Sequence, residues 1–310
     1  MATKQAEIVV VIPALNEESG IGKTLEELKT TLHNYDYRIV VVDGHSTDAT
    51  VEIAKKHGAT VIYQRGPGYG AALKTGFLYG LHRVGASLFL AIDADGSYAV
   101  QDAPKLIDCL VRGKADYVTG RRIPEGKNAM SYPNKVGNWM ISWMTRWLLR
   151  IPLHDSQTGM FAFRASLIRG TALRTHGWAI NTELLKRAAE MDMTIEEVPV
   201  TYRSRLGKTK LGLVVGGLAN LAVILRMMRD AEPLLLFGIF AGIFVLAGIL
   251  TGASVVAEWI MTGTETHVGT AILSSMSVMI GIQLLAFGLL ADMVTSRTTS
   301  EGSDMRFEKA

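Results

Sequence analysis

The chain has 310 residues, a formal net charge of +3 and a single cysteine, Cys109. So small a positive charge gives no argument for binding nucleic acid, and one cysteine can form neither an internal disulfide nor a cysteine-based zinc site within the chain. The length allows two domains, or one domain with an appendage. No long apolar segment precedes the first β-rich run, so we expect no signal peptide.

β-Branched runs alternate with helical patterns through the first third of the chain. Strands are predicted at 7–12, 38–42, 60–63 and 87–92, and helices at 21–32, 46–56 and 71–84. This alternation predicts an α/β fold with a mostly parallel sheet covered on both faces. Ligands of such sheets bind beyond the carboxyl ends of the strands. The polar residues predicted at those ends are Asn16, Glu17, Asp43 and Asp93.

Two carboxylates one residue apart, Asp93 and Asp95, follow the strand predicted at 87–92. Hard oxygen ligands at the carboxyl edge of a sheet suit Mg²⁺ or Mn²⁺ carrying a diphosphate. An Asp-Gly turn after a strand is also common at protein surfaces, so the pair alone leaves a metal site and a turn both open.

A glycine-rich segment at 66–70 follows the third predicted strand. Its Gly-x-Gly-x-Gly spacing fits a dinucleotide-binding fingerprint poorly. A flexible backbone close to a nucleotide or sugar explains the glycines better, and a tight turn is the alternative.

Trp139, Trp143 and Trp147 recur every fourth residue within a helix predicted at 136–153, so they share one helical face. Tryptophan favours the head-group level of a membrane, and arginines lie in the same segment. The pattern predicts docking to a membrane surface, with a tryptophan-rich core helix as the alternative.

Two long apolar segments, 233–257 and 268–291, contain no Asp, Glu, Lys or Arg. Each exceeds the ~20 residues that span a hydrocarbon core, whereas helices in a soluble core normally carry a polar face. Basic residues flank the pair and are absent from the turn between them, so the positive-inside rule places both termini in the cytoplasm. Glycines in the first segment would let helices pack closely, which allows a homo-oligomer.

The sequence thus predicts four regions. They are a cytoplasmic domain at 1–210, a juxtamembrane interfacial helix at 211–232, a transmembrane hairpin at 233–295 and a cytoplasmic tail at 296–310.

Several segments resemble glycosyltransferase family 2, in the order typical of that family. They are 9–17 (VVVIPALNE), 40–48 (VVVDGHSTD), 68–72 (GYGAA), 91–96 (AIDADG) and 155–164 (DSQTGMFAFR). With its C-terminal hairpin, the chain resembles polyprenyl-phosphate glycosyltransferases of the dolichyl-phosphate mannose synthase type. The resemblance covers about residues 7 to 212 in detail and the hairpin in architecture only.

The resemblance implies a GT-A fold that binds a nucleotide-diphosphate sugar and one divalent metal, Mg²⁺ or Mn²⁺. The residues implied in nucleotide binding are Pro13, Ala14, Asn16, Glu17, Asp43, Gly70 and Asp93. Asp95, with Asp93, would ligate the metal. Family members often have two adjacent aspartates where this chain has Asp43 and Gly44, so the second acid's contribution is missing.

Catalytic roles are predicted for Asp95, Arg122, Asp155 and Gln157. The last two would lie by the sugar and the acceptor, with Asp155 left open as a base, an orienting group or a helix cap. An acceptor phosphate needs cations rather than a strong base. The predicted lipid-phosphate-binding residues are Arg121, Arg122, Arg203, Arg205, Lys208 and Lys210. The stretch 203–210 would alternatively contact only lipid head groups.

These features together predict an inverting transferase at the cytoplasmic face of the cell membrane. It would move a monosaccharide from a nucleotide-diphosphate sugar, UDP preferred over GDP by resemblance, to a polyprenyl or dolichyl phosphate. The alternatives are a transferase with another membrane acceptor and a non-catalytic membrane scaffold with a transferase-like domain.

Overall fold

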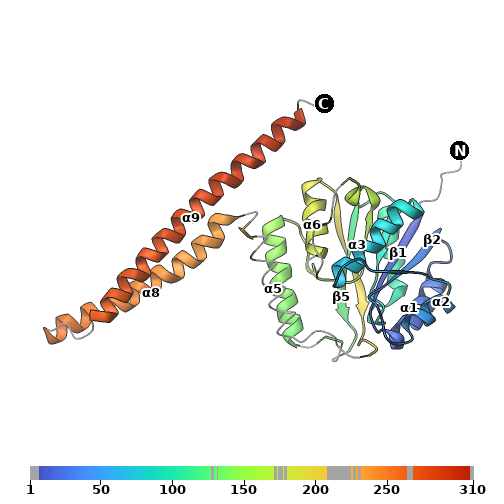
Figure 1. Ribbon diagram of the computed structural model, residues 1–310, viewed down its shortest axis with the longest axis horizontal. Coiled ribbons are helices and arrows are strands. Elements are labelled where there is room, and N and C mark those ends of the chain that lie inside the picture. The colour runs from blue at the N-terminus through green and yellow to red at the C-terminus, as the bar shows by residue number, and fades with distance from the viewer. Residues whose placement is uncertain are drawn as a thin grey trace. The chain divides into compact units, whose positions relative to one another are not determined.

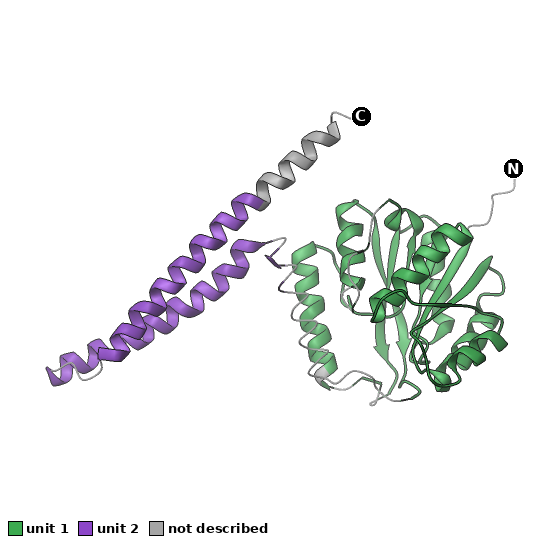
Figure 2. Cartoon of the chain, viewed as in Figure 1, with its two compact units in different colours: residues 1–220 green, residues 221–310 purple. Residues whose placement is uncertain are grey.

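The apolar runs of the N-terminal region form one seven-stranded sheet in the computed structural model. The structure describes residues 7–126, 129–130, 132–170, 173, 177, 180–207, 225, 228–229, 232–263 and 268–307, with the side chains of α9 through residue 294. The chain divides into two compact units, Met1–Asn220 and Leu221–Ala310 (Figure 2).

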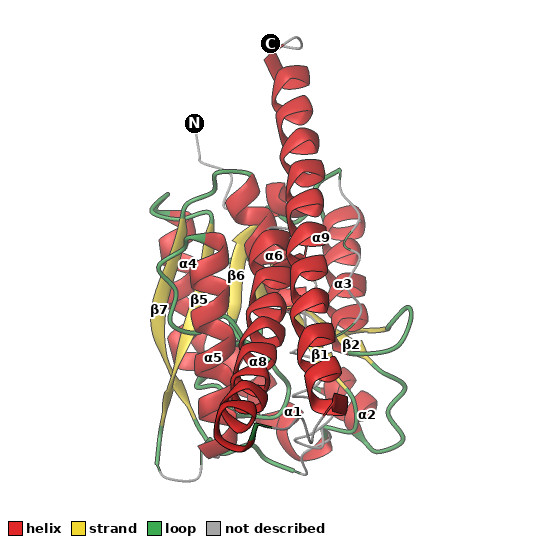
Figure 3. Ribbon diagram, turned by 90° about the vertical axis from the view of Figure 1, so that its left-hand side faces the viewer, coloured by secondary structure: helices red, strands yellow, loops and turns green. Residues whose placement is uncertain are grey.

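The sheet of the first unit is mostly parallel, as predicted. Its strands are β1 (Ile8–Ala14), β2 (Tyr37–Asp43), β3 (Thr60–Tyr63), β4 (Leu88–Ala91), β5 (Tyr117–Pro124), β6 (Phe161–Arg164) and β7 (Ile195–Tyr202). They lie in the order β3-β2-β1-β4-β6-β5-β7, with β7 at an edge (Figure 3). Only β6 among these strands runs antiparallel to its neighbours, β4 and β5.

Helices cover both faces of this sheet (Figure 1). They are α1 (Glu18–Thr31), α2 (Thr50–Lys56), α3 (Tyr69–Tyr79), α4 (Ala103–Val111), α5 (Tyr132–Leu149) and α6 (Ile180–Glu190). Successive residues of a strand face opposite sides, so Ile8, Val10 and Ile12 pack against α1, α2 and α4. Val9 and Val11 pack with α3 and α6 on the other face. This two-sided burial explains why β1 is continuously apolar.

Three predicted helices have other ends in the structure. The helix expected at 46–56 begins at Thr50, because Asp48 Oδ1 accepts the Thr50 N–H at 3.0 Å and the preceding residues form a loop. The helix expected at 71–84 is α3 followed by a π turn (Gly80–Val84) that ends at Gly85, with φ 80°. The helix expected at 136–153 ends at Leu149, since Arg150 has φ 54° and Pro152 follows.

The second unit contains a helical hairpin that consists of α8 (Pro233–Thr262) and α9 (Val268–Phe307). Both helices are long and apolar enough to cross a membrane, and only 11% and 17% of their most apolar windows are buried, unlike helices of a soluble core. Gly248 lies where a Cβ would meet Ser274 O at 2.8 Å, so the helices approach closely there. Gly238 and Gly242 lie where a Cβ would meet nothing within 4 Å.

Candidate active site

The carboxyl ends of β1, β2 and β4 meet at one edge of the sheet. β2 and β4 flank β1 on opposite sides, which is the arrangement that opens a ligand-binding crevice in α/β sheets. Asn16 and Glu17 follow β1, Asp43 ends β2, and Asp93 and Asp95 follow β4. The structure therefore brings these predicted site residues to one edge.

The loops after β1 and β2 are held together by hydrogen bonds. Asn16, with φ 48°, accepts the Thr47 N–H on Oδ1 at 2.7 Å, and its own N–H donates to Ser46 Oγ at 2.9 Å. The Ser46 N–H and hydroxyl in turn donate to the two carboxylate oxygens of Asp43, at 2.9 and 2.5 Å. Asp43 is fully buried, so its carboxylate supports this loop from below.

The remaining predicted nucleotide-binding residues lie around the same edge. Pro13 and Ala14 end β1, and Gly70 is buried in the first turn of α3. Gly68, just before α3, has φ 94°, a conformation that favours glycine. The Tyr69 hydroxyl donates to an Asp93 carboxylate oxygen at 3.0 Å, so the glycine-rich turn places a hydrogen-bond donor against the carboxylates after β4.

Asp93, Asp95 and Glu17 concentrate negative charge at this edge. Burial, and next the charge of Asp95, raise the pKa of Asp93 above its usual range. Asp95 is 9% exposed, accepts the Ser97 N–H at 2.9 Å and lies 3.7 Å from Arg205 Nε. The Arg205 guanidinium also donates to Glu17 Oε1 at 3.1 Å. Its Nε is buried and has no hydrogen-bond partner, so Arg205 offsets this charge only in part.

The donor atoms fit a hard divalent cation. No group of three or more histidine, cysteine, aspartate or glutamate side chains within the described ranges would hold an ion alone. Asp93 and Asp95 would therefore supply carboxylate oxygens, and a diphosphate would complete the ligand set. Asp93 and Asp95 follow one strand and Glu17 follows its neighbour, and this concentration of carboxylates at one edge is the observation that favours a cation there.

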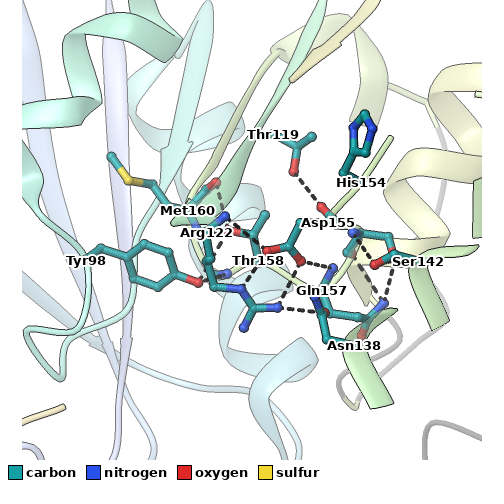
Figure 4. Close-up of polar contacts among 12 residues, drawn as sticks. Tyr98, Thr119, Arg122, Asn138, Ser142, His154, Asp155, Gln157, Thr158 and Met160 are labelled. Carbon is teal, nitrogen blue, oxygen red and sulfur yellow. Dashed lines mark hydrogen bonds and ion pairs between the residues drawn. The ribbon is translucent and has the colours of Figure 1, made fainter. Parts of the chain in front are cut away.

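A buried ion pair joins Arg122 of β5 to Asp155, in the loop after α5 (Figure 4). Arg122 of β5 donates from Nε to Asp155 Oδ2 at 2.7 Å and from Nη2 to Oδ1 at 2.9 Å, a bidentate pair. Nη2 also donates to Asn138 Oδ1, on α5, at 2.7 Å. Burial alone would raise the pKa of Asp155, but the charge and hydrogen bonds of Arg122 outweigh it and lower that pKa. Asp155 is therefore a poor proton acceptor, and its two hydrogen bonds fix the position of the Arg122 guanidinium.

The loop that carries Asp155 and Gln157 is braced on several sides. Glu197 Oε1 accepts the N–H groups of His154 and Asp155, both at 2.8 Å. Gln157 donates from Nε2 to Thr182 Oγ1, on α6, at 3.2 Å. A Cβ at Gly159 would lie 2.0 Å from Asp93 Oδ2, so the loop can pass the carboxylate only as glycine.

The predicted phosphate-binding cations within the described residues have different partners. Arg121 and Arg122 are neighbours on β5, so their side chains leave opposite faces, and Arg122 alone of the two reaches Asp155. Arg203 pairs with Glu27 at 3.4 Å and Glu125 at 3.2 Å. Arg205 contacts Glu17 and Asp95 as described above. Lys208 and Lys210, and most of the interfacial helix predicted at 211–232, lie outside the described residues.

The tryptophans of α5 are exposed. Trp139 is 65% exposed, and Trp143 and Trp147 are each 47% exposed. These values argue against a tryptophan-rich core helix within the described part of the first unit.

Several contributing residues were not predicted. Tyr69, Asn138, Gly159 and Glu197 hold Asp93, Arg122 or Asp155 in place. Tyr69 and Gly159 lie inside the family-like segments 68–72 and 155–164, next to residues that were predicted to belong to the site. Membership of these segments could therefore have identified them. Asn138 and Glu197 carry no such signal, because their partners lie far away in the chain.

Comparisons with known proteins agree with this geometry. The family profile described as Glycosyl transferase family 2 matches residues 9–174. A dolichyl-phosphate hexose transferase of Haloferax volcanii is 35% identical over 213 residues, which cover 69% of this chain and 90% of that protein. A UDP-N-acetylglucosamine–dolichyl-phosphate N-acetylglucosaminyltransferase of Methanococcus voltae is 32% identical over 215 residues, covering 62% of this chain and 84% of that protein.

A solved structure shares the fold of the first unit. It is glucosyl-3-phosphoglycerate synthase of Mycobacterium tuberculosis, in complex with Mn²⁺, UDP-glucose and phosphoglyceric acid. The TM-score is 0.56 at 22% identity, over 72% of this chain and 79% of that chain. The likeness confirms the predicted GT-A type of α/β domain.

Proposed function

The chain belongs to glycosyl transferase family 2, and on that premise we propose that it transfers a monosaccharide from a nucleotide-diphosphate sugar to a polyprenyl phosphate at a membrane surface. The related hexose transferase of Haloferax volcanii is named for a dolichyl phosphate, which supports this acceptor class. The two apolar helices of the second unit support a membrane-bound substrate.

The observation that carries the proposal is the pairing of opposite charges at one sheet edge. Asp93 and Asp95 concentrate negative charge after β4, and Arg122 is held beside them by Asp155 and Asn138. Burial and the charge of Asp95 raise the pKa of Asp93, and the charge of Arg122 opposes part of that rise, so Arg122 and Asp93 interact electrostatically. A site of this kind can hold a cation with a diphosphate and, next to it, a second anion.

The chemistry follows from the charges. An acceptor phosphate is largely ionised near neutral pH, so a general base contributes little. Its oxygen forms a bond to the anomeric carbon while the bond from that carbon to the diphosphate breaks. The nucleoside diphosphate leaves with the electron pair, and attack from the opposite face inverts the configuration. A divalent cation at Asp93 and Asp95 would supply Lewis acidity for the leaving group.

Arg122 is the residue we assign to the acceptor phosphate. Its hydrogen bonds to Asp155 and Asn138 use Nε and Nη2, so Nη1 is the donor group that would bind an anion. Asp155 then acts by orienting Arg122, and Gln157, tied to α6 through Thr182, would bind a sugar hydroxyl. Arg205 would meet the diphosphate when its contacts with Glu17 and Asp95 exchange.

The exposed tryptophan face of α5 would bring this site to the membrane. Trp139, Trp143 and Trp147 share that face, and tryptophan favours the head-group level. The basic flanks of the hairpin favour the cytoplasmic leaflet by the positive-inside rule. We assign the enzyme to that leaflet of the cell membrane, with a UDP-sugar as the donor.

A transfer assay tests the proposal. Detergent-purified protein is incubated with Mn²⁺ or Mg²⁺, a polyprenyl phosphate and a panel of labelled UDP- and GDP-sugars. We expect label in the organic phase that depends on the metal, and its loss in Asp95→Asn. Asp36→Asn, which removes the same charge from an exposed position, is the matched control and should keep full activity.

Two results would contradict the proposal. Nucleotide binding without organic-phase product from any donor would exclude the polyprenyl phosphate acceptor. Near-normal turnover by Asp95→Asn would exclude the metal role of that carboxylate.

A further inference from the structure

The side chain of Gln64 lies against Gly44, the position at which the family resemblance implies a second acid. Ala14, Asp43 and Tyr63 lie in register at the ends of β1, β2 and β3. The residues that follow these strand ends, Leu15, Gly44 and Gln64, therefore lie next to one another at the same edge. The Gly44 N–H donates to Ala14 O at 2.8 Å, and the Gln64 N–H donates to Asp43 O at 3.0 Å.

The side-chain amide of Gln64 covers Gly44. A Cβ on Gly44 would lie 3.2 Å from Gln64 Oε1 and 3.3 Å from the Leu15 Cβ. That distance is short for a Cβ contact, so a side chain at position 44 and the present position of Gln64 compete for one space. The polar group that fills this space is thus an amide rather than a carboxylate.

Asp43 does not replace the missing acid. Its carboxylate is fully buried and accepts two hydrogen bonds from Ser46. Beside it, the exposed rings of His45 and Tyr63 stack in parallel, 5.4 Å apart and 8° from coplanar. The region beyond β2 and β3 therefore combines a flat aromatic surface with one amide.

We infer that Gln64 binds the nucleobase of the donor and selects uracil over guanine. The inference rests on the proposed nucleotide-sugar donor and adds the residue that reads its base. Uracil presents one N–H between two carbonyl oxygens, and an amide offers an acceptor next to a donor, so two hydrogen bonds form. Guanine presents two adjacent N–H groups, which a carboxylate accepts together and an amide can satisfy only in part.

The test is calorimetric titration of the full chain in detergent, with Mn²⁺ and either UDP or GDP as the probe. The readout is the ratio of the two affinities, because a new charge at position 64 weakens both nucleotides through the diphosphate and cancels in the ratio. We expect the wild type to bind UDP more tightly. Gln64→Glu should shift the ratio toward GDP by about tenfold or more, as a matched hydrogen-bonding edge is worth about 1–3 kcal/mol between bases.

Three further variants sharpen the test. Gln64→Ala removes the amide without adding charge and should reduce the preference for UDP. Gly44→Ala should do the same with Gln64 intact, because its Cβ displaces the amide. Gln101→Glu adds the same charge at an exposed residue of the 3₁₀ turn Val100–Asp102 and should leave the ratio unchanged.

Tighter binding of GDP by the wild type would overturn the inference. So would a ratio that stays within about twofold of wild type in both Gln64 variants. Base-selective binding that depends on Gln64, without transfer to polyprenyl phosphate, would uphold this inference and contradict the proposed acceptor. Binding of neither nucleotide would contradict the proposed donor and the inference together.

Discussion

The carboxylates on the β2 side and on the β4 side of the sheet edge have different surroundings. On the β2 side, Asp43 is fully buried and both of its oxygens accept hydrogen bonds from Ser46. On the β4 side, Asp93 is half-buried next to the buried Asp95, and desolvation and the Asp95 charge raise its pKa. An aspartate at the carboxyl end of a buried strand thus supports a loop in one place and concentrates charge in the other. The difference lies in how many donors the adjacent loop supplies.

The two sides also differ in how much stability is lost when one interaction partner is removed. Hydrogen bonds join the segments after β1 and β2, whereas a buried ion pair joins β5 to the loop after α5. Removing one partner of a buried pair costs more than removing one neutral donor, because a charge is left without compensation.

Asp155→Asn should have the largest effect on stability. It leaves the Arg122 guanidinium buried without its charge partner, and we expect a loss of about 3–5 kcal/mol in the free energy of unfolding. Urea unfolding of the full chain in detergent, followed by tryptophan fluorescence, measures it. Glu190→Gln, which breaks the exposed pair with Lys186, is the matched control and should cost less than about 1 kcal/mol. Equal losses would show that burial does not distinguish the two pairs.

Gly159→Ala should disturb the β4 side of the sheet edge next most strongly. The new Cβ must displace the Asp93 carboxylate, and overpacking of this kind costs about 1–3 kcal/mol. We expect transfer activity to fall at least as steeply, since Asp93 moves. Gly137→Ala, where a Cβ meets nothing within 4 Å, should keep wild-type stability and activity. An active Gly159→Ala enzyme would mean that the carboxylate position is not critical.

Ser46→Ala tests the β2 side of the sheet edge. It removes the hydroxyl that donates to Asp43 and accepts from Asn16, and the loss of a bond to a charged group costs about 1.5 kcal/mol. UDP affinity should fall, because the loop that carries His45 loosens. A lower urea midpoint with unchanged UDP affinity would show that this loop stabilises the fold but does not contribute to nucleotide binding.

The pH dependence of the Arg122–Asp155 pair should be the smallest effect per pH unit. The pKa of Asp155 is lower in the folded state than the usual value of about 3.9. The stabilisation is therefore fully present above about pH 4 and is lost as the pH falls through the folded-state value, by at most about 1.4 kcal/mol per unit. Unfolding of wild type and Asp155→Asn between pH 7 and pH 3 should show the gap between them narrowing only at the acid end. A constant gap would contradict the assignment.

Much of the fold could be predicted because its signals are local. The β-branched runs predicted β1 to β4, and the predicted ends of β3 match the structure. Helix ends were harder to predict: α2 begins at Thr50, because the Ser46 hydroxyl donates to the Asp43 carboxylate and Asp48 Oδ1 accepts the Thr50 N–H, so neither residue starts a longer helix. Such competition between local hydrogen bonds cannot be read from helix propensity.

The site could be predicted in part for a related reason. Asp93 and Asp95 could be predicted because they directly follow a strand. Arg205 could not be paired with Glu17, because the two residues are 188 positions apart in the chain. The partners of the arginines predicted to bind phosphate could not be predicted either: neighbours on a strand leave opposite faces, and Arg203 pairs with two glutamates that are far away in the chain.

Strands β1 to β4, the two long apolar helices and the carboxylates at strand ends could be predicted from the amino-acid sequence. Those properties depend on side chains near one another in the chain. The contacts of Asp155 with Arg122 and of Gln64 with Gly44 depend instead on the tertiary structure. The order of the strands brings these residues together, and a contact across strands depends on that order rather than on local sequence.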